Sequence, residues 1–194
     1  LQKHGHTVAM TGDGINDVLA LKIADCSIAM ASGSDAAKNT SNIVLLDNNF
    51  DVLPHVVHEG RRVINNITAS ASMYLIKTIF SVLLAAGLII FGHGYPFEPI
   101  QLTVISACCV GIPTFFLTYE PNFNRVSGDF LITVFRNAFP FALMIAISSA
   151  FIVNGGRMIG YDKDTLYTIC ILLTAWCYYC GLKHIYSPLA PSLG

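Results

Sequence analysis

The chain has 194 residues, of which 54% are hydrophobic and 12% are charged, with a mean hydropathy of +0.59. Soluble domains of this size rarely have such a composition, so we expect much of the chain to lie in a membrane. The formal net charge of −1, with interspersed acids and bases, excludes the basic surface typical of nucleic-acid-binding proteins.

The first third of the chain alternates between strand-like and helix-like segments. Residues 7–10 are short, apolar and rich in β-branched side chains, which predicts a buried strand, and residues 18–24 predict a helix. Further strands are expected at 27–30 and 43–46, with helices between them. This order predicts an α/β fold for the first third.

The loop at 10–17 reads Met-Thr-Gly-Asp-Gly-Ile-Asn-Asp and carries the candidate chemistry. Gly12 and Gly14 permit close backbone approaches, so Asp13 can be held at the carboxyl end of a strand, where open α/β sheets bind ligands. Asn16 and Asp17 lie at the start of the next helix, where backbone donors favour anions. Carboxylates beside a phosphate favour a hard cation, and Mg²⁺ suits that role. A turn without chemistry is the alternative interpretation.

Residues 50–66 predict a stalk helix, with Pro54 tolerated near its start, that continues into the first of four apolar segments. Crossing a bilayer takes about 20 apolar residues. We expect membrane spans near 67–92, 100–119, 137–153 and 166–182. Four spans place both ends of the chain on one side, and the arginines and lysines next to the spans favour the cytoplasm for the soluble part.

Lys77 is the only charged residue of the first span. A charge within a span is costly and is a functional-site candidate, either as a built-in counter-cation or as the partner of a carboxylate elsewhere. The alternative is a lysine that extends to the interface.

The second span carries Gly111 and Pro113, which predict an interruption of the helix. Broken membrane helices expose carbonyl groups that coordinate ions, so the carbonyls of 109–111 are candidates. A packing kink is an equal alternative. Span hydroxyls, including that of Ser106, add neutral oxygens, although such groups more often bond to backbone.

The six cysteines and the aromatic residues of the last span have simpler interpretations. Cys108, Cys109 and a C-x-x-C at 177–180 suggest a soft metal, but we favour small apolar residues inside a bilayer. Trp176, with Tyr178, Tyr179 and Tyr186, resembles an aromatic belt at a membrane interface.

Residues 8–30, VAMTGDGINDVLALKIADCSIAM, closely resemble the hinge motif of P-type ATPases, and SDAAKNTSNIVLLDNNF and HEGRRVINNI continue the resemblance. The resemblance implies a partial HAD-like, Rossmann-like phosphorylation domain (1–52), a stalk helix (53–66) and a four-helix transmembrane bundle (67–194). It implies Mg²⁺ and ATP as cofactors. Asp13 would be the magnesium ligand, Asn16 would lie near the phosphoryl group, and Asp17 would order the site. The implied cofactor-binding residues are Thr11, Gly12 and Asn16, and the implied metal ligands are Asp13 and Asp17.

Family members phosphorylate an aspartate in an Asp-Lys-Thr-Gly-Thr motif and dephosphorylate through a Thr-Gly-Glu loop, and neither motif occurs here. Lys3 does not match the family's phosphate-site lysine. We therefore expect a C-terminal piece of a pump that is inactive alone and that binds ATP mainly through the missing part.

The calcium and sodium pumps of the family place oxygen ligands on the first two of these spans. Alignment on residues 74–77 and 111–113 places Ile79 and Val82 at the Asn and Glu positions. It places Ser106, Cys109 and Val110 at the Asn, Thr and Asp positions. Because a hard divalent ion needs six or more oxygens, these side chains leave the identity of the ion open. The candidate transport residues are Lys77, Ser106, Cys109, Gly111 and Pro113.

The resemblance predicts a multi-pass membrane ATPase, in a bacterial plasma membrane, that transports a cation, with calcium or another divalent metal favoured. Its partners would be the cation, the bilayer and the remaining domains of the same pump, without nucleic acid. The alternatives are a P-type ATPase for a polyamine or lipid, and a non-catalytic scaffold derived from a pump.

Overall fold

The computed structural model describes residues 1–91, 95–126 and 128–186, and it divides into two units, Leu1–Val57 and His58–Gly194. Each unit has its own hydrophobic core. The predicted fold class is confirmed, since a small parallel α/β unit is followed by four helices that are long and apolar enough to span a membrane.

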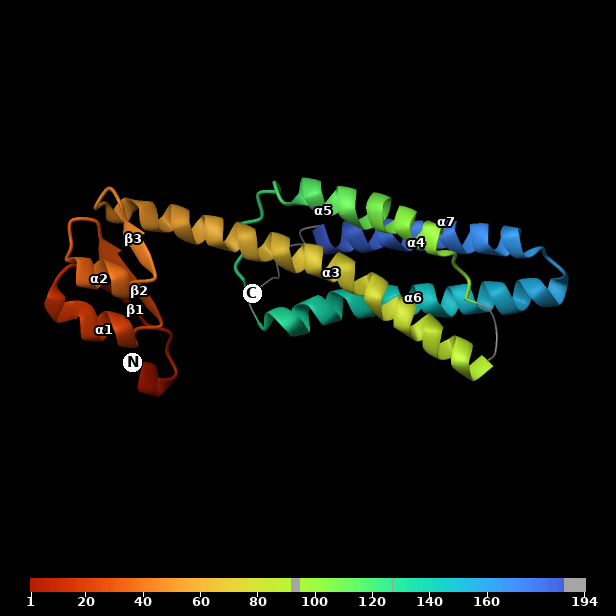
Figure 1. Ribbon diagram of the computed structural model, residues 1–194, viewed down its shortest axis with the longest axis horizontal. Helices are drawn as coiled ribbons and strands as arrows, with labels where there is room; N and C mark the ends of the chain where they lie inside the picture. Colours follow the sequence, from red (N-terminus) through yellow and green to blue (C-terminus); the bar gives the residue numbers. More distant parts are fainter. Residues whose placement is uncertain (92–94, 127, 187–194) are drawn as a thin grey trace, which may run out of the picture. The chain divides into compact units, whose positions relative to one another are not determined.

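The first unit contains a three-stranded parallel sheet in the order β1-β2-β3 (Figure 1). The strands are β1 (Ala9–Gly12), β2 (Cys26–Met30) and β3 (Ile43–Leu45), and the helices that connect them are α1 (Val18–Ile23) and α2 (Asp35–Thr40). Leu21, Ala29 and Ala37 are buried between sheet and helices, and Met10 packs against them. This parallel β-α-β-α-β order brings the ends of β1 and β2 to one edge of the sheet.

The strand predicted at 7–10 lies at 9–12 instead. Thr11 pairs with Ile28 and Gly12 pairs with Ala29, so the ladder extends into the glycine motif. At the other end, the N–H of Val8 is bound by the side chain of Asp25, outside the regular ladder. The local β-branched pattern therefore placed the strand too early, because its extent is set by the partner strand.

The second unit contains the four candidate spans. The helix α3 runs from Leu53 to Phe91 after a short 3-10 turn, η3 (Phe50–Val52). The second span consists of α4 (Pro99–Ile105), the π-helical segment η4 (Ser106–Gly111) and α5 (Ile112–Leu117). The last two spans are α6 (Phe130–Ile159) and α7 (Lys163–Tyr186), which extend beyond the predicted 137–153 and 166–182 at both ends.

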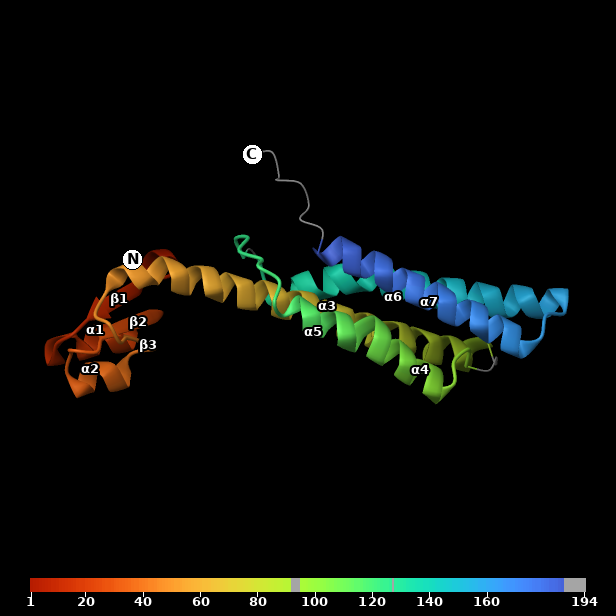
Figure 2. The same cartoon turned by 90° about the horizontal axis from the view of Figure 1, so that it is seen from above.

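All four spans contribute to one core. Residues Ile76, Val110, Ile145 and Cys177, one from each span, are buried in it. Helices α6 and α7 lie side by side as an antiparallel pair, which is visible from two directions (Figures 1 and 2). Gly156 of α6 contacts the side chain of Leu166 on α7, where a Cβ atom would collide with it. Many large apolar side chains face outward, as is normal for helices surrounded by lipid.

Candidate functional site

Asp13 follows the last residue of β1 directly and is exposed at the carboxyl end of the sheet. The loop after β2 reaches the same place, because the N–H of Ser34 donates a 2.8 Å hydrogen bond to the carbonyl of Asp13. Two loops thus meet at the edge where open α/β sheets bind their ligands. The carboxylate of Asp13 remains exposed at this edge.

The carboxylate of Asp17 orders this loop. Its Oδ2 atom accepts hydrogen bonds from the N–H groups of Gly14 (3.1 Å) and Asp13 (3.3 Å). Gly12 is required by the same arrangement, since a Cβ atom there would lie 2.6 Å from the Cβ of Asp17. The carboxylate of Asp17 therefore fixes the backbone at both Asp13 and Gly14.

Gly33 is a site residue that the sequence analysis did not identify. A Cβ atom at this position would lie 2.8 Å from the carbonyl oxygen and 3.0 Å from the Cα of Asp13. Both are backbone atoms, which cannot swing away as a side chain can. The available signal was a glycine shortly after the second predicted strand, which is typical of a close backbone approach.

Asn16 and Thr11 occupy different surroundings. Asn16 is exposed in the 3-10 turn η2 (Ile15–Asp17), next to α1, whereas Thr11 is half-buried inside β1. Both were expected in the loop at 10–17. Helix α1 has only six residues, so the contribution of its dipole to anion binding is small.

The carboxylates of Asp13 and Asp17 are hard oxygen donors, which suit magnesium better than a soft metal. Among the described residues no three His, Cys, Asp or Glu side chains form a group able to hold a metal ion. Mg²⁺ commonly uses one or two carboxylates and completes its shell with phosphate oxygens and waters. An exposed Asp13 beside Asp17 matches that requirement.

Lys77 and Ser106, both candidate transport residues, meet in the second unit. The Nζ of Lys77 donates a 2.5 Å hydrogen bond to the Oγ of Ser106, and that hydroxyl donates to the carbonyl of Leu102, also at 2.5 Å. Lys77 is half-buried. The structure thus holds the ammonium group at the junction of α4 and η4.

The expected interruption of the second span is a widened π-helical turn, so the backbone stays helical through Gly111. The Oγ1 of Thr114 donates to the carbonyls of Val110 (2.8 Å) and Gly111 (3.0 Å). Pro113 is the second residue of α5, which continues directly from η4, and without an N–H it cannot donate to a carbonyl of the preceding turn. The hydroxyl of Thr114 therefore shares its one proton between two of the three candidate carbonyls at 109–111, and coordination of an ion by this segment stays a prediction.

Tyr178 was assigned to an aromatic belt, and this assignment is wrong. Trp176 and Tyr179 are 64% and 57% exposed, but Tyr178 is only 1% exposed. Its side chain lies in the core that also includes Val110 and, at its margin, the half-buried Cys109. Its hydroxyl has no hydrogen-bond partner among the described residues. A buried hydroxyl without a partner therefore lies beside η4. It was missed because Tyr178 was grouped with its aromatic neighbours, whereas its spacing along the helical period of α7 places it on the buried face.

Comparison with known proteins identifies the family. A model of haloacid dehalogenase-like hydrolases matches residues 1–57. The calcium-transporting ATPase CtpE of Mycobacterium bovis is 48% identical over 162 residues, which cover 77% of this chain and 20% of the relative. The probable cation-transporting ATPase exp7 of Streptococcus pneumoniae is 44% identical over 181 residues, 89% of this chain and 23% of the relative.

The chain belongs to the P-type cation-transporting ATPases. A more distant member, the P-type sodium-transporting ATPase4 of Toxoplasma gondii, is 39% identical over 123 residues, 63% of this chain and 9% of the relative. The chain spans about a fifth of the length of the bacterial relatives it matches. Its candidate spans and its bacterial P-type relatives identify a multi-pass membrane protein.

Proposed function

We propose that this P-type ATPase segment belongs to an ATP-driven pump that transports a cation through an aspartyl-phosphate intermediate. Calcium or another divalent metal is the favoured cargo, since the CtpE relatives are named calcium-transporting ATPases. The phosphorylated aspartate would lie outside these 194 residues, which contain no Asp-Lys-Thr-Gly-Thr motif. The segment alone should then form no phosphoenzyme.

The observation that carries this proposal is the exposed carboxylate of Asp13 at the carboxyl end of β1, in a loop held by Asp17. Asp13, with Asp17 beside it, would hold a magnesium ion, which when bound neutralises charge on the phosphoryl group. Thr11 and Gly12 set the direction of the loop at the end of the strand, and Asn16 presents its exposed amide next to it. The roles of these residues are positioning and charge compensation.

We place the transport site around Lys77 and Ser106, with Cys109, Gly111 and Pro113 farther along the second span. Residues 60–97, 99–119, 130–161 and 165–186 contain no Asp or Glu. A cation bound among these spans alone would therefore rely on hydroxyl and carbonyl oxygens, including the hydroxyl of Tyr178. The Lys77 ammonium would act as a built-in counter-cation when the site is empty of cargo.

A second candidate function is transport of a non-metal cargo, such as a polyamine or a lipid. It is favoured by the same absence of carboxylates within the spans and by the hydrogen-bonded ammonium of Lys77. A pump of this kind would keep the chemistry at Asp13 and differ only in what regulates it.

ATP-dependent phosphoenzyme formation by the intact protein that contains this segment tests both candidates. The purified protein is titrated with calcium, manganese, magnesium, zinc, potassium and spermidine, with Asp13→Ala and Lys77→Ala measured in parallel. Regulation by calcium or manganese, altered by Lys77→Ala, would support the metal pump. Regulation only by spermidine would favour the second candidate, and no phosphoenzyme under any condition would indicate a non-catalytic scaffold.

The location follows from the same proposal. The segment would lie in a bacterial plasma membrane with its first unit in the cytoplasm, where ATP is available. Its partners would be the transported cation, the bilayer and the remaining domains of the pump.

A further inference from the structure

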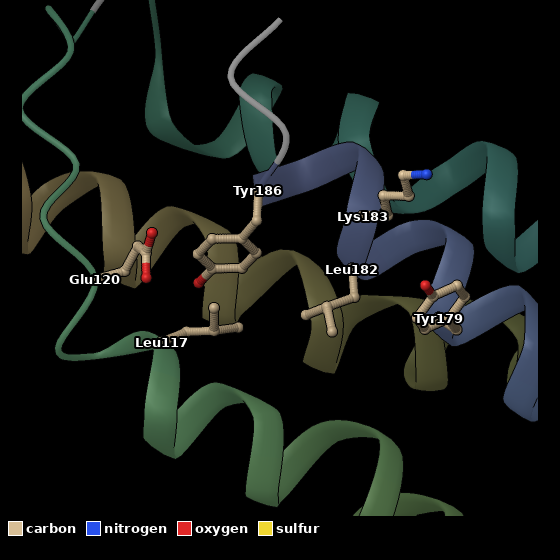
Figure 3. Close-up of a pocket in the computed structure, with 6 residues that line it drawn as sticks. All are labelled: Leu117, Glu120, Tyr179, Leu182, Lys183 and Tyr186. Carbon is tan, nitrogen blue, oxygen red and sulfur yellow. The ribbon is translucent and has the colours of Figure 1, made fainter.

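A pocket of about 440 Å³ lies between the end of α5 and the last turns of α7. Three kinds of side chain line it: apolar, aromatic and charged (Figure 3). Leu117 and Leu182 are apolar, Tyr179 and Tyr186 are aromatic, and Glu120 and Lys183 carry opposite charges. None of these six residues belongs to the transport site proposed above.

One polar group in this pocket lacks a partner. The hydroxyl of Tyr186 is buried and makes no hydrogen bond of ordinary geometry within the described part of the chain, although the side chain of Ser70 lies near it. In Figure 3 it lies between the side chains of Leu117 and Glu120. Because buried hydroxyls are normally satisfied, this one indicates a polar ligand beside Glu120.

The two charged side chains are separated across the pocket. Glu120 lies on one side, and Lys183 extends from α7 on the other, with its ammonium directed away from Glu120 (Figure 3). The backbone next to Glu120 is held in place, because the Nδ2 of Asn66 donates to its carbonyl at 3.0 Å. The pocket thus presents a negative side, on a backbone that is held in place, and a positive side.

The pocket also lies where two spans end, since α5 ends at Leu117 and α7 ends at Tyr186. The ends of spans meet the headgroup region of a bilayer, where tyrosine side chains are enriched. A zwitterionic headgroup with an ammonium and a phosphate matches the opposite charges, and the leucines match the acyl chains next to it.

We propose that this pocket binds the headgroup of an aminophospholipid such as phosphatidylethanolamine. The ammonium lies between the carboxylate of Glu120 and the hydroxyl of Tyr186. The ammonium of Lys183 pairs with the lipid phosphate. This inference does not rest on the proposed transport function, because it concerns only how the second unit meets the bilayer.

Lipid selectivity tests the proposal directly. The intact protein is reconstituted in nanodiscs with spin-labelled phosphatidylethanolamine or phosphatidylglycerol, which lacks the ammonium, and the immobilised fraction of each is compared. We expect a preference for phosphatidylethanolamine that Glu120→Gln reduces about tenfold, as for a lost charged hydrogen bond, and that Tyr186→Phe reduces about threefold.

A matched variant separates the pocket from general surface charge. Glu98→Gln removes the same charge from an exposed position at the start of α4, at the other end of the second span from Glu120, and it should leave the preference unchanged. An equal preference in wild type and Glu120→Gln, or the same loss in Glu98→Gln, would overturn the proposal.

Photocrosslinking distinguishes a lipid from another part of the polypeptide. A benzophenone amino acid replaces Tyr179, and the adduct formed in phosphatidylethanolamine nanodiscs is identified by mass spectrometry. A lipid adduct that Glu120→Gln diminishes is the expected result. A peptide adduct in place of lipid, or a lipid adduct insensitive to Glu120→Gln, would mean that the pocket is filled by protein or by unselected lipid.

Discussion

The ammonium of Lys77 donates a 2.5 Å hydrogen bond to the hydroxyl of Ser106, although 29 positions separate the two residues in sequence. Replacing Ser106 by alanine removes the acceptor and leaves a half-buried charge without it. We expect Ser106→Ala to lower the free energy of unfolding by about 1–3 kcal/mol, the usual cost of an unsatisfied group. Thermal unfolding of the intact protein in detergent measures this loss.

Two further variants define the pair. Thr103→Val removes an exposed hydroxyl of the second span, and this hydroxyl donates only to the backbone carbonyl of Pro99 one turn earlier. We expect it to change stability much less than Ser106→Ala does. Lys77→Met should make Ser106→Ala nearly neutral, because the charge that needs the hydroxyl is gone. If Ser106→Ala costs the same in both backgrounds, the hydrogen bond does not contribute to stability.

Gly33→Ala places a methyl group 2.8 Å from the carbonyl oxygen of Asp13. Since the neighbours are backbone atoms, the loop carrying Asp13 must move, and we expect a loss of about 1–3 kcal/mol together with lower phosphoenzyme formation. Gly60→Ala is the control, because nothing lies within 4 Å of its Cβ position. Wild-type phosphorylation in Gly33→Ala would show that the close approach of these loops is not required.

Gly156 and Gly155 form a matched pair on α6. A Cβ at Gly156 collides with the side chain of Leu166, which is only 2% exposed, whereas a Cβ at Gly155 meets nothing within 4 Å. Gly156→Ala should destabilise the α6–α7 pair by about 1–3 kcal/mol through overpacking. Gly155→Ala should be neutral or stabilise the helix by about 0.5–1 kcal/mol. Equal melting temperatures for the two variants would contradict close packing at Gly156.

Asp25 should make the first unit sensitive to acid. The N–H of Val8 donates to its carboxylate at 2.8 Å, and this bond, with help from the side chain of Gln2, lowers the pKa of Asp25 below its usual 3.8. A lowered pKa stabilises the fold above the unfolded-state value, and that stabilisation is lost as the pH falls through the folded-state pKa.

Unfolding of the intact protein, followed by hydrogen exchange in the first unit between pH 2 and pH 6, measures this effect. Asp25→Asn should remove part of the stability gained as the pH rises through about 4, near the unfolded-state pKa. Asp47→Asn removes another exposed carboxylate, one that accepts no hydrogen bond among the described residues, and it serves as the control. Identical pH profiles for both variants would argue against the role of Asp25.

Local pattern alone predicted which elements this protein forms, although not where each of them begins and ends. The apolar runs predicted four spans, and strand and helix periods predicted the parallel α/β unit, because hydrophobicity and backbone propensity act over a few residues. The motif around Asp13 likewise predicted a position at the carboxyl end of a strand, but pairing with β2 set where that strand ends.

The tertiary structure decided which side chains meet. The bonds from Asp17 to its own loop, the space for Gly33 beside Asp13, and the pairing of Lys77 with Ser106 all depend on how separate segments pack. Burial of Tyr178 depends likewise on which face of α7 turns toward the core. These contacts are long-range, and the entropy lost in forming them is offset only by the whole packed fold, so a local sequence pattern does not reveal them.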